Sequence, residues 1–149
     1  MAHAQQQILE AVQTVLANGN TAAGDRVFLD RVDALQPGEL PAILVDESPD
    51  GETAEPFNLH GLEQRQLSVQ VRGIVAHGTE AAAQARDLGL EVEKLIAGST
   101  TLAAMAQGGV RIESSRPANE GDGDRLMALR EQSWRFTYYV NPEAPDTLL

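Results

Sequence analysis

The chain contains no cysteine and only one lysine, Lys94, among its 149 residues. Without cysteine, disulfide bonds, thiolate metal sites and cysteine nucleophiles are excluded. Lysine and arginine together number 11 against 22 acidic residues, which gives a formal net charge of −11. Binding to nucleic acid or to an anionic membrane depends on clustered cations, and the chain has no basic run. We therefore expect neither sequence-specific nucleic-acid binding nor membrane binding.

Aromatic residues are also scarce, at 4% of the chain, and no apolar run approaches the roughly 20 residues that span a bilayer. The polar start of the chain has no apolar signal core, so we expect a soluble protein. The hydrophobic fraction of 42% is nevertheless typical of globular domains. Residues 1–149 thus predict one domain whose core is mainly Val, Leu, Ile and Ala.

Two segments have the apolar spacing of amphipathic helices. In residues 4–17, Ile8, Val12 and Leu16 fall on one stripe, and Gly19 follows as a stop signal. Residues 79–96 carry a second stripe that includes Leu88. A further helical turn is expected over residues 102–106.

Strand patterns fill most of the remaining chain. Residues 64–76 alternate between apolar side chains such as Val69 and polar ones such as Gln70, as in a sheet with one buried side. Trp134, Phe136 and Tyr138 alternate in the same way near the end of the chain, and we assign them to the core rather than to a base-stacking platform. The expected strands are residues 26–32, 42–46, 64–76, 110–114 and 126–140.

The pattern predicts an α+β fold in the order α-β-β-β-α-β-β, with a mostly antiparallel sheet of about five strands and two main helices on one face. Residues 47–59 are expected to form a long acidic loop, because Pro49-Asp50-Gly51 is a turn signal. A second polar loop is expected over residues 116–124. Residues 141–149 are expected to be a mobile tail.

No pattern of reaction chemistry is present. His3, His60 and His77 lack ligand spacing and are expected to be surface or capping residues. Residues 120–124 faintly resemble a calcium loop but lack its later glutamate, so a turn between strands is expected. Phosphate-binding glycine loops and nucleophile elbows are absent. We therefore predict no catalytic, cofactor-binding or metal-binding residues, and no enzyme activity.

The order of these elements resembles that of the tail terminator (minor tail protein U-like) family of long-tailed bacteriophages and prophages. The resemblance includes Arg26-Val27-Phe28, Arg31-Val32, the run from Glu39 to Val45, Arg65 to Val71, and the strand around Trp134. It covers roughly residues 8–140.

The resemblance implies a structural protein of the virion tail, assembled in the host cytoplasm. Family members form a ring, usually a hexamer, on the head-proximal end of the tail tube. The ring stops tube polymerisation and offers a surface for head attachment. The implied partners are further copies of the chain, the tail tube protein and a head-completion or connector protein.

Two alternatives remain at this point: another head–tail connector or tail-completion protein, and a small ligand-binding or enzymatic α+β domain. Under the leading hypothesis, function lies in sheet edges and loops, above all in residues 47–59. An aromatic side chain on an acidic background suits a contact with a neighbour or with the tube, although folding back onto the core fits equally well. The candidate assembly contacts are Glu47, Asp50, Glu52, Glu55, Phe57 and Leu59.

Overall fold

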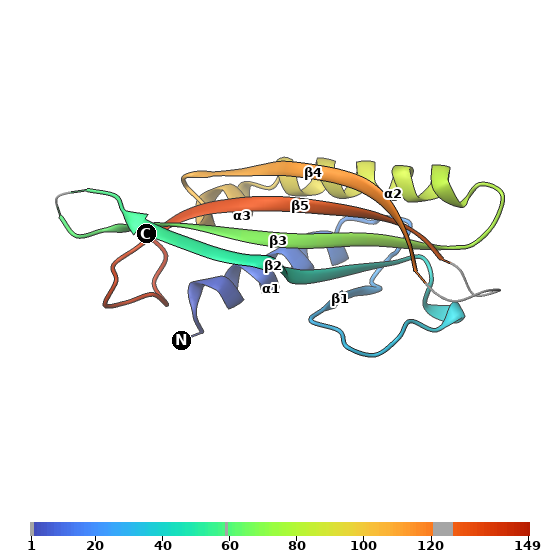
Figure 1. Cartoon of the computed structure of the whole chain (residues 1–149), viewed down its shortest axis with the longest axis horizontal. Coiled ribbons are helices and arrows are strands. Elements are labelled where there is room, and N and C mark those ends of the chain that lie inside the picture. The colour runs from blue at the N-terminus through green and yellow to red at the C-terminus, as the bar shows by residue number, and fades with distance from the viewer. Residues whose placement is uncertain (1, 59, 121–126) are drawn as a thin grey trace.

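A five-stranded mixed sheet with helices on one of its faces forms the body of the protein (Figure 1). The computed structural model describes residues 2–58, 60–120 and 127–149. The strand order is β1-β2-β3-β5-β4, with β1 parallel to β2 and the other neighbours antiparallel. The elements are α1 (Ala4–Ala17), β1 (Val27–Leu29), the 3-10 turn η1 (Pro37–Glu39), β2 (Ala42–Pro56), β3 (Glu63–Ala76), α2 (Ala81–Ala97), α3 (Thr100–Met105), β4 (Gly109–Glu120) and β5 (Met127–Val140). The predicted α+β fold and its element order are confirmed.

The main core lies between the sheet and the helices, which are behind the sheet in Figure 1. The apolar stripes predicted for both long helices are buried there, as are Trp134, Phe136 and Tyr138 of β5. Burying a large apolar side chain contributes roughly 1.5–3 kcal/mol, so this layer supplies most of the driving force for folding. Gly73 of β3 lets α2 approach closely, because a Cβ there would lie 3.0 Å from Leu88.

A smaller apolar cluster lies on the opposite face of the sheet, at one end only. Leu44, Ile74 and Leu129 are buried there beneath Phe28, Leu35 and Leu40. Arg31 holds the residues above this cluster together. Its guanidinium stacks 4.5 Å from the ring centroid of Phe28 and forms an ion pair of 2.7 Å with Glu39. The rest of this face has no covering element among the described residues.

The prediction of a long loop over residues 47–59 is wrong. β2 continues to Pro56, and its turn signal produces a bulge instead of a loop. Residues 48–51 lie opposite Ser68 alone, and Gly51 adopts a φ of +66° that favours glycine. Pairing with β3 resumes at Glu52, so the chain crosses the interruption without leaving the sheet.

Two further expectations about irregular segments also change. The polar loop expected from residue 116 is strand as far as Glu120, because β4 pairs with β5 along its length. Residues 121–124, with most of the faint calcium-loop pattern, lie outside the described residues. The tail expected to be mobile is hydrogen-bonded to the body of the protein, since the Ala4 N–H donates to the Pro145 carbonyl and the Leu149 N–H to that of Tyr139.

No helix in the described ranges is long and apolar enough to cross a bilayer.

Candidate functional site

The six candidate contact residues do not form one loop. Glu47 and Asp50 lie at the start of the bulge and within it, and both are exposed. Glu52 and Glu55 follow on β2, and Phe57 comes immediately after the strand. Leu59 lies outside the described residues. Because side chains alternate along a strand, Glu52 and Glu55 point to opposite faces of the sheet and cannot act as one acidic patch.

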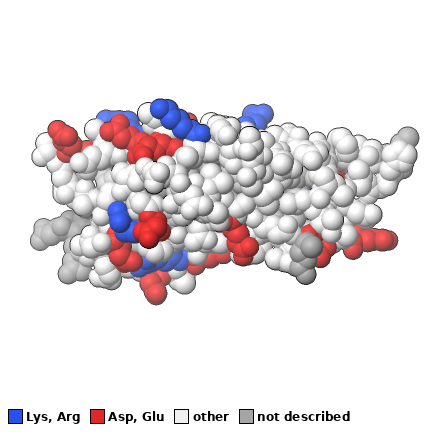
Figure 2. Space-filling view, turned by 180° about the vertical axis from the view of Figure 1, so that it is seen from behind, with Lys and Arg blue, Asp and Glu red and all other residues white. Residues whose placement is uncertain are grey.

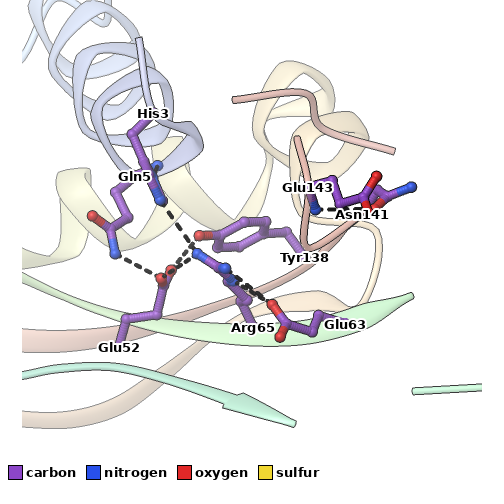
Figure 3. A network of polar contacts seen from close by, with 8 residues as sticks. All are labelled: His3, Gln5, Glu52, Glu63, Arg65, Tyr138, Asn141 and Glu143. Atoms are coloured by element: carbon purple, nitrogen blue, oxygen red, sulfur yellow. Dashed lines mark hydrogen bonds and ion pairs between the residues drawn. The ribbon is translucent and has the colours of Figure 1, made fainter. Parts of the chain in front are cut away.

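Glu52 is removed from the surface by a polar network on the helix side of the sheet (Figure 3). Its side chain is only 8% exposed. The Tyr138 hydroxyl donates to one carboxylate oxygen, and the Gln5 side-chain amide donates to the other at 2.6 Å. Arg65 approaches the second oxygen at 3.4 Å. These donors satisfy the carboxylate within the chain, which leaves Glu52 little capacity for a contact outside it.

The network fastens the start of α1 to β2, β3 and β5. His3 caps α1 by accepting the Gln5 N–H at Nδ1, at 3.1 Å, and its Nε2 lies 3.3 Å from the Arg65 guanidinium. Arg65 also pairs with Glu63 at 2.9 Å. His3 therefore has the capping role expected for it, and it connects helix and sheet through Arg65.

Burial and the neighbouring Glu52 raise the pKa of Tyr138 above its ordinary value of 10.0. Burial disfavours the phenolate, and the bond to Glu52 requires the phenol to keep its proton. Arg65 opposes the shift without cancelling it. Tyr138 therefore acts as a fixed hydrogen-bond donor at ordinary pH.

Phe57 forms an exposed contact at the end of the β2–β3 hairpin, which projects beyond the helices in Figure 1. Its ring lies 4.5 Å from that of Tyr139, and 51% of Phe57 remains exposed. Leu149, which is 44% exposed, is held at the same place by its backbone bond to Tyr139. Phe57 thus packs partly back on the chain, as the second sequence-based option expected, and still presents an apolar surface, while its contact with a neighbour stays a prediction. We call Phe57, Tyr139 and Leu149 the end cluster.

The uncovered part of the sheet is polar and carries a shallow depression of about 340 Å³. Small side chains such as Ser68 and Ser133 form its floor, and Asp50, Glu113 and Arg135 stand around it. Arg135 is paired with Glu113 at 2.9 Å. The depression therefore offers hydrogen-bonding groups, while the arginine in its lining already has an acidic partner.

The fold does not gather the scattered arginines into a basic surface within the described residues. Five of them form ion pairs with acidic side chains, namely Arg31, Arg65, Arg72, Arg116 and Arg135. On the face behind the sheet, basic side chains are few and lie mostly beside acidic ones (Figure 2). Paired cations attract phosphates weakly.

The sequence did not reveal the partners of Glu52. Tyr138 lies 86 positions away in the chain and Gln5 lies 47 positions away. No local pattern encodes such contacts. The sequence did contain one signal. Arg65 lies two residues before Leu67 in β3, and therefore on the face of the strand that is otherwise apolar. A charged residue at such a position needs a partner.

Within the described ranges, no group of three His, Cys, Asp or Glu side chains is arranged to hold a metal ion. The sequence matches no protein-family model and no curated protein.

Proposed function

We propose that this chain is a structural virion protein that caps the head-proximal end of a phage tail tube as a ring. Bound there, it stops tube polymerisation and offers a surface for head attachment. The resemblance to tail terminators supports the proposal through the element order, and the fold preserves that order.

The observation that carries the proposal is the end cluster. Phe57, Tyr139 and Leu149 place partly exposed apolar side chains at a projecting end of the molecule. Apolar side chains gathered at an exposed site are typical of protein–protein contacts. Aromatic side chains in particular supply contact energy when a partner covers them. We assign this end to contacts with the tube or with an adjacent subunit.

The test is a tube-capping assay by electron microscopy. Tail tube protein of the same phage is polymerised with and without the chain. We expect shorter tubes, each with a ring at one end, when the chain is present. Unchanged tube lengths together with bare tube ends would reject the proposal.

Two matched variants locate the contact. Phe57→Ser removes the aromatic side chain of the end cluster and should reduce capping. Leu90→Ser serves as the control, because Leu90 is similarly exposed, at 49%, but lies on α2. It should cap as the unaltered chain does. Equal loss of capping in both variants would contradict the assignment of the end cluster.

A connector or tail-completion role remains the runner-up, since it uses the same surfaces. The order of binding separates the two roles. A tail terminator binds the tube before any head component, whereas a connector binds the head first. Mixing the chain separately with tubes and with DNA-filled heads, and imaging both, distinguishes them.

One observation favours the ligand-binding alternative. A groove of about 520 Å³ lies between α2 and the turn before β2, with Leu40, Pro41 and Leu88 in its lining and Asp87 and Glu91 beside them. A small cationic ligand with an apolar part would suit such a groove. Screening such compounds by thermal shift, with the exposed Asp87→Asn as the comparison, tests this alternative.

A further inference from the structure

We propose that neighbouring subunits join through their sheets, with β4 of one copy pairing along the distal half of β2 of the next. The inference rests on the proposed ring, for which it names the subunit contact. It concerns two short segments, residues 52–55 of β2 and 109–112 of β4.

Both segments have an open backbone edge. β1 pairs only with Ile43, Leu44 and Val45, so the distal half of β2 has a strand neighbour on one side alone. Among the described residues, β4 likewise pairs only with β5. Within the described ranges, the Gly109 N–H donates to the Ala106 carbonyl at 2.9 Å, and the backbone of residues 52–55 and 110–112 makes no hydrogen bond on its outer side. Unpaired strand edges readily accept a strand from another chain.

The strand directions suit a head-to-tail contact. Each step from β2 through β3 and β5 to β4 is antiparallel, so β4 runs opposite to β2. A second copy placed beside β4, with the same face of its sheet forward, presents β2 antiparallel to β4. The joined strands then form an ordinary antiparallel ladder. Because two different edges meet, the contact is heterologous, which is the kind that closes into rings.

Charge favours the same arrangement. Arg111 of β4 is exposed and makes no ion pair or side-chain hydrogen bond within the described part of the chain. It lies opposite Arg135 and therefore on the uncovered face of the sheet. Asp50 and Glu55 stand on that face at the β2 edge. Joining the edges brings Arg111 of one copy toward Asp50 and Glu55 of the next. This attraction favours pairing of β4 with β2 over pairing of two like edges.

The chain also limits how far the edges can pair. Pro56 has no N–H to donate and ends the open segment of β2. On β4, the register shifts between Ile112 and Ser114 and interrupts the regular edge. The contact is therefore short, so that additional contacts with the tube end would be needed to hold a closed ring.

Cysteine cross-linking tests the contact directly, because the chain has no cysteine of its own. Thr53→Cys and Arg111→Cys each place one thiol on the uncovered face. Glu55→Cys, two residues further along β2, accommodates a shift in register. The variants are oxidised alone and in mixed pairs, both in concentrated solution and on tube ends. We expect disulfide dimers when Thr53→Cys or Glu55→Cys is mixed with Arg111→Cys, and far fewer when any of these variants is oxidised alone.

Absence of mixed dimers under both conditions would overturn the inference, as would equal dimer yields from the single variants. These outcomes are separable from those of the proposed function. Rings that cap tubes without mixed dimers leave the proposed function standing and reject the edge pairing. Bare tubes together with mixed dimers in solution reject the proposed function and leave the edge pairing standing.

A charge exchange gives a second, independent readout. Arg111→Glu should reduce the fraction of capped tube ends several-fold, and adding Glu55→Arg or Asp50→Arg should restore part of it. Lys94→Glu is the control, since it makes the same charge change at an exposed position on α2. If Lys94→Glu reduces capping equally, or if neither double variant restores it, the pairing of these edges is rejected.

Discussion

The two halves of β2 differ both in burial and in the strands that pair with them. Residues 42–45 are buried, with β1 on one side and β3 on the other. Beyond the bulge, residues 53–56 are all exposed, and in the described part of the chain β3 is the one strand that pairs with them. A single strand thus contributes its first half to the core and keeps its second half open. The bulge is the boundary, because it interrupts the pairing and sets a new register.

In the proposed ring, this difference would let a small domain combine stability with assembly. The first half contributes burial, which is the dominant favourable term in folding. The second half contributes little burial, and Glu52 fastens it to α1 through a polar network instead. In the proposed ring, this half would bind a neighbour without exposing the core. Mutations in the two halves should therefore have different consequences.

The largest effect is expected in the buried half. Ile43→Ala removes a fully buried side chain and should lower the free energy of unfolding by about 2–5 kcal/mol. Thr53→Ala, in the exposed half, should change it by less than about 0.5 kcal/mol. Urea denaturation followed by circular dichroism measures both. Similar losses would show that the halves do not differ as described.

Removing the anchor of the open half should have an intermediate effect. Glu52→Ala leaves the Tyr138 hydroxyl and the Gln5 amide without their acceptor, which should cost about 1–3 kcal/mol of unfolding free energy. Glu55→Ala is the control, because Glu55 is exposed and, among the described residues, accepts only from the Gln64 side chain. It should be nearly neutral. A neutral result for Glu52→Ala would mean that the network does not hold α1 to the sheet.

The same anchor should weaken at alkaline pH. The folded pKa of Tyr138 is raised above 10.0, so the folded state holds this proton more tightly than the unfolded state. The resulting stabilisation is complete below pH 10 and is lost as the pH rises toward the folded pKa. Comparing urea midpoints of the unaltered chain and Tyr138→Phe between pH 8 and 11 measures it. Parallel pH curves would contradict the prediction.

The smallest effect is expected at the cover of the buried half, where Arg31 holds Glu39. The bond from Arg31, aided by the Gln36 N–H, lowers the pKa of Glu39 from 4.5 to about 2. Its stabilisation is therefore present above pH 4.5 and lost as the pH falls toward 2. Arg31→Met should return the pKa toward 4.5, as followed by the carboxyl carbon shift in an NMR titration. An unchanged pKa would exclude Arg31 as its cause.

The sequence predicted those parts of the fold that depend on local periodicity. The first helix, residues 4–17, and the buried alternation of Trp134, Phe136 and Tyr138 were both correct, because amphipathic spacing directly reflects the buried face. The distal half of β2 was missed because Pro49-Asp50-Gly51 has turn chemistry, and a bulge uses that chemistry within a strand. The edge strand β4 was predicted too short because its exposed half lacks apolar alternation.

The candidate site was predictable only in part. Phe57 was singled out correctly as an exposed aromatic residue, since its polar surroundings are visible in the sequence. The burial of Glu52 was not foreseen, because it depends on residues from α1, β3 and β5 that only the folded chain brings together. Arg111 likewise became a candidate only when the structure placed it on an open edge.

Hydrogen–deuterium exchange of β2, in the free chain and on capped tubes, tests the central claim most directly. In the free chain we expect slow exchange at residues 43–45 and fast exchange of the outward amides at residues 52–55 and 110–112. On capped tubes the outward amides in both open segments should slow, while residues 43–45 should stay as they were. Unchanged exchange at both open segments in a ring-capped sample would contradict the account.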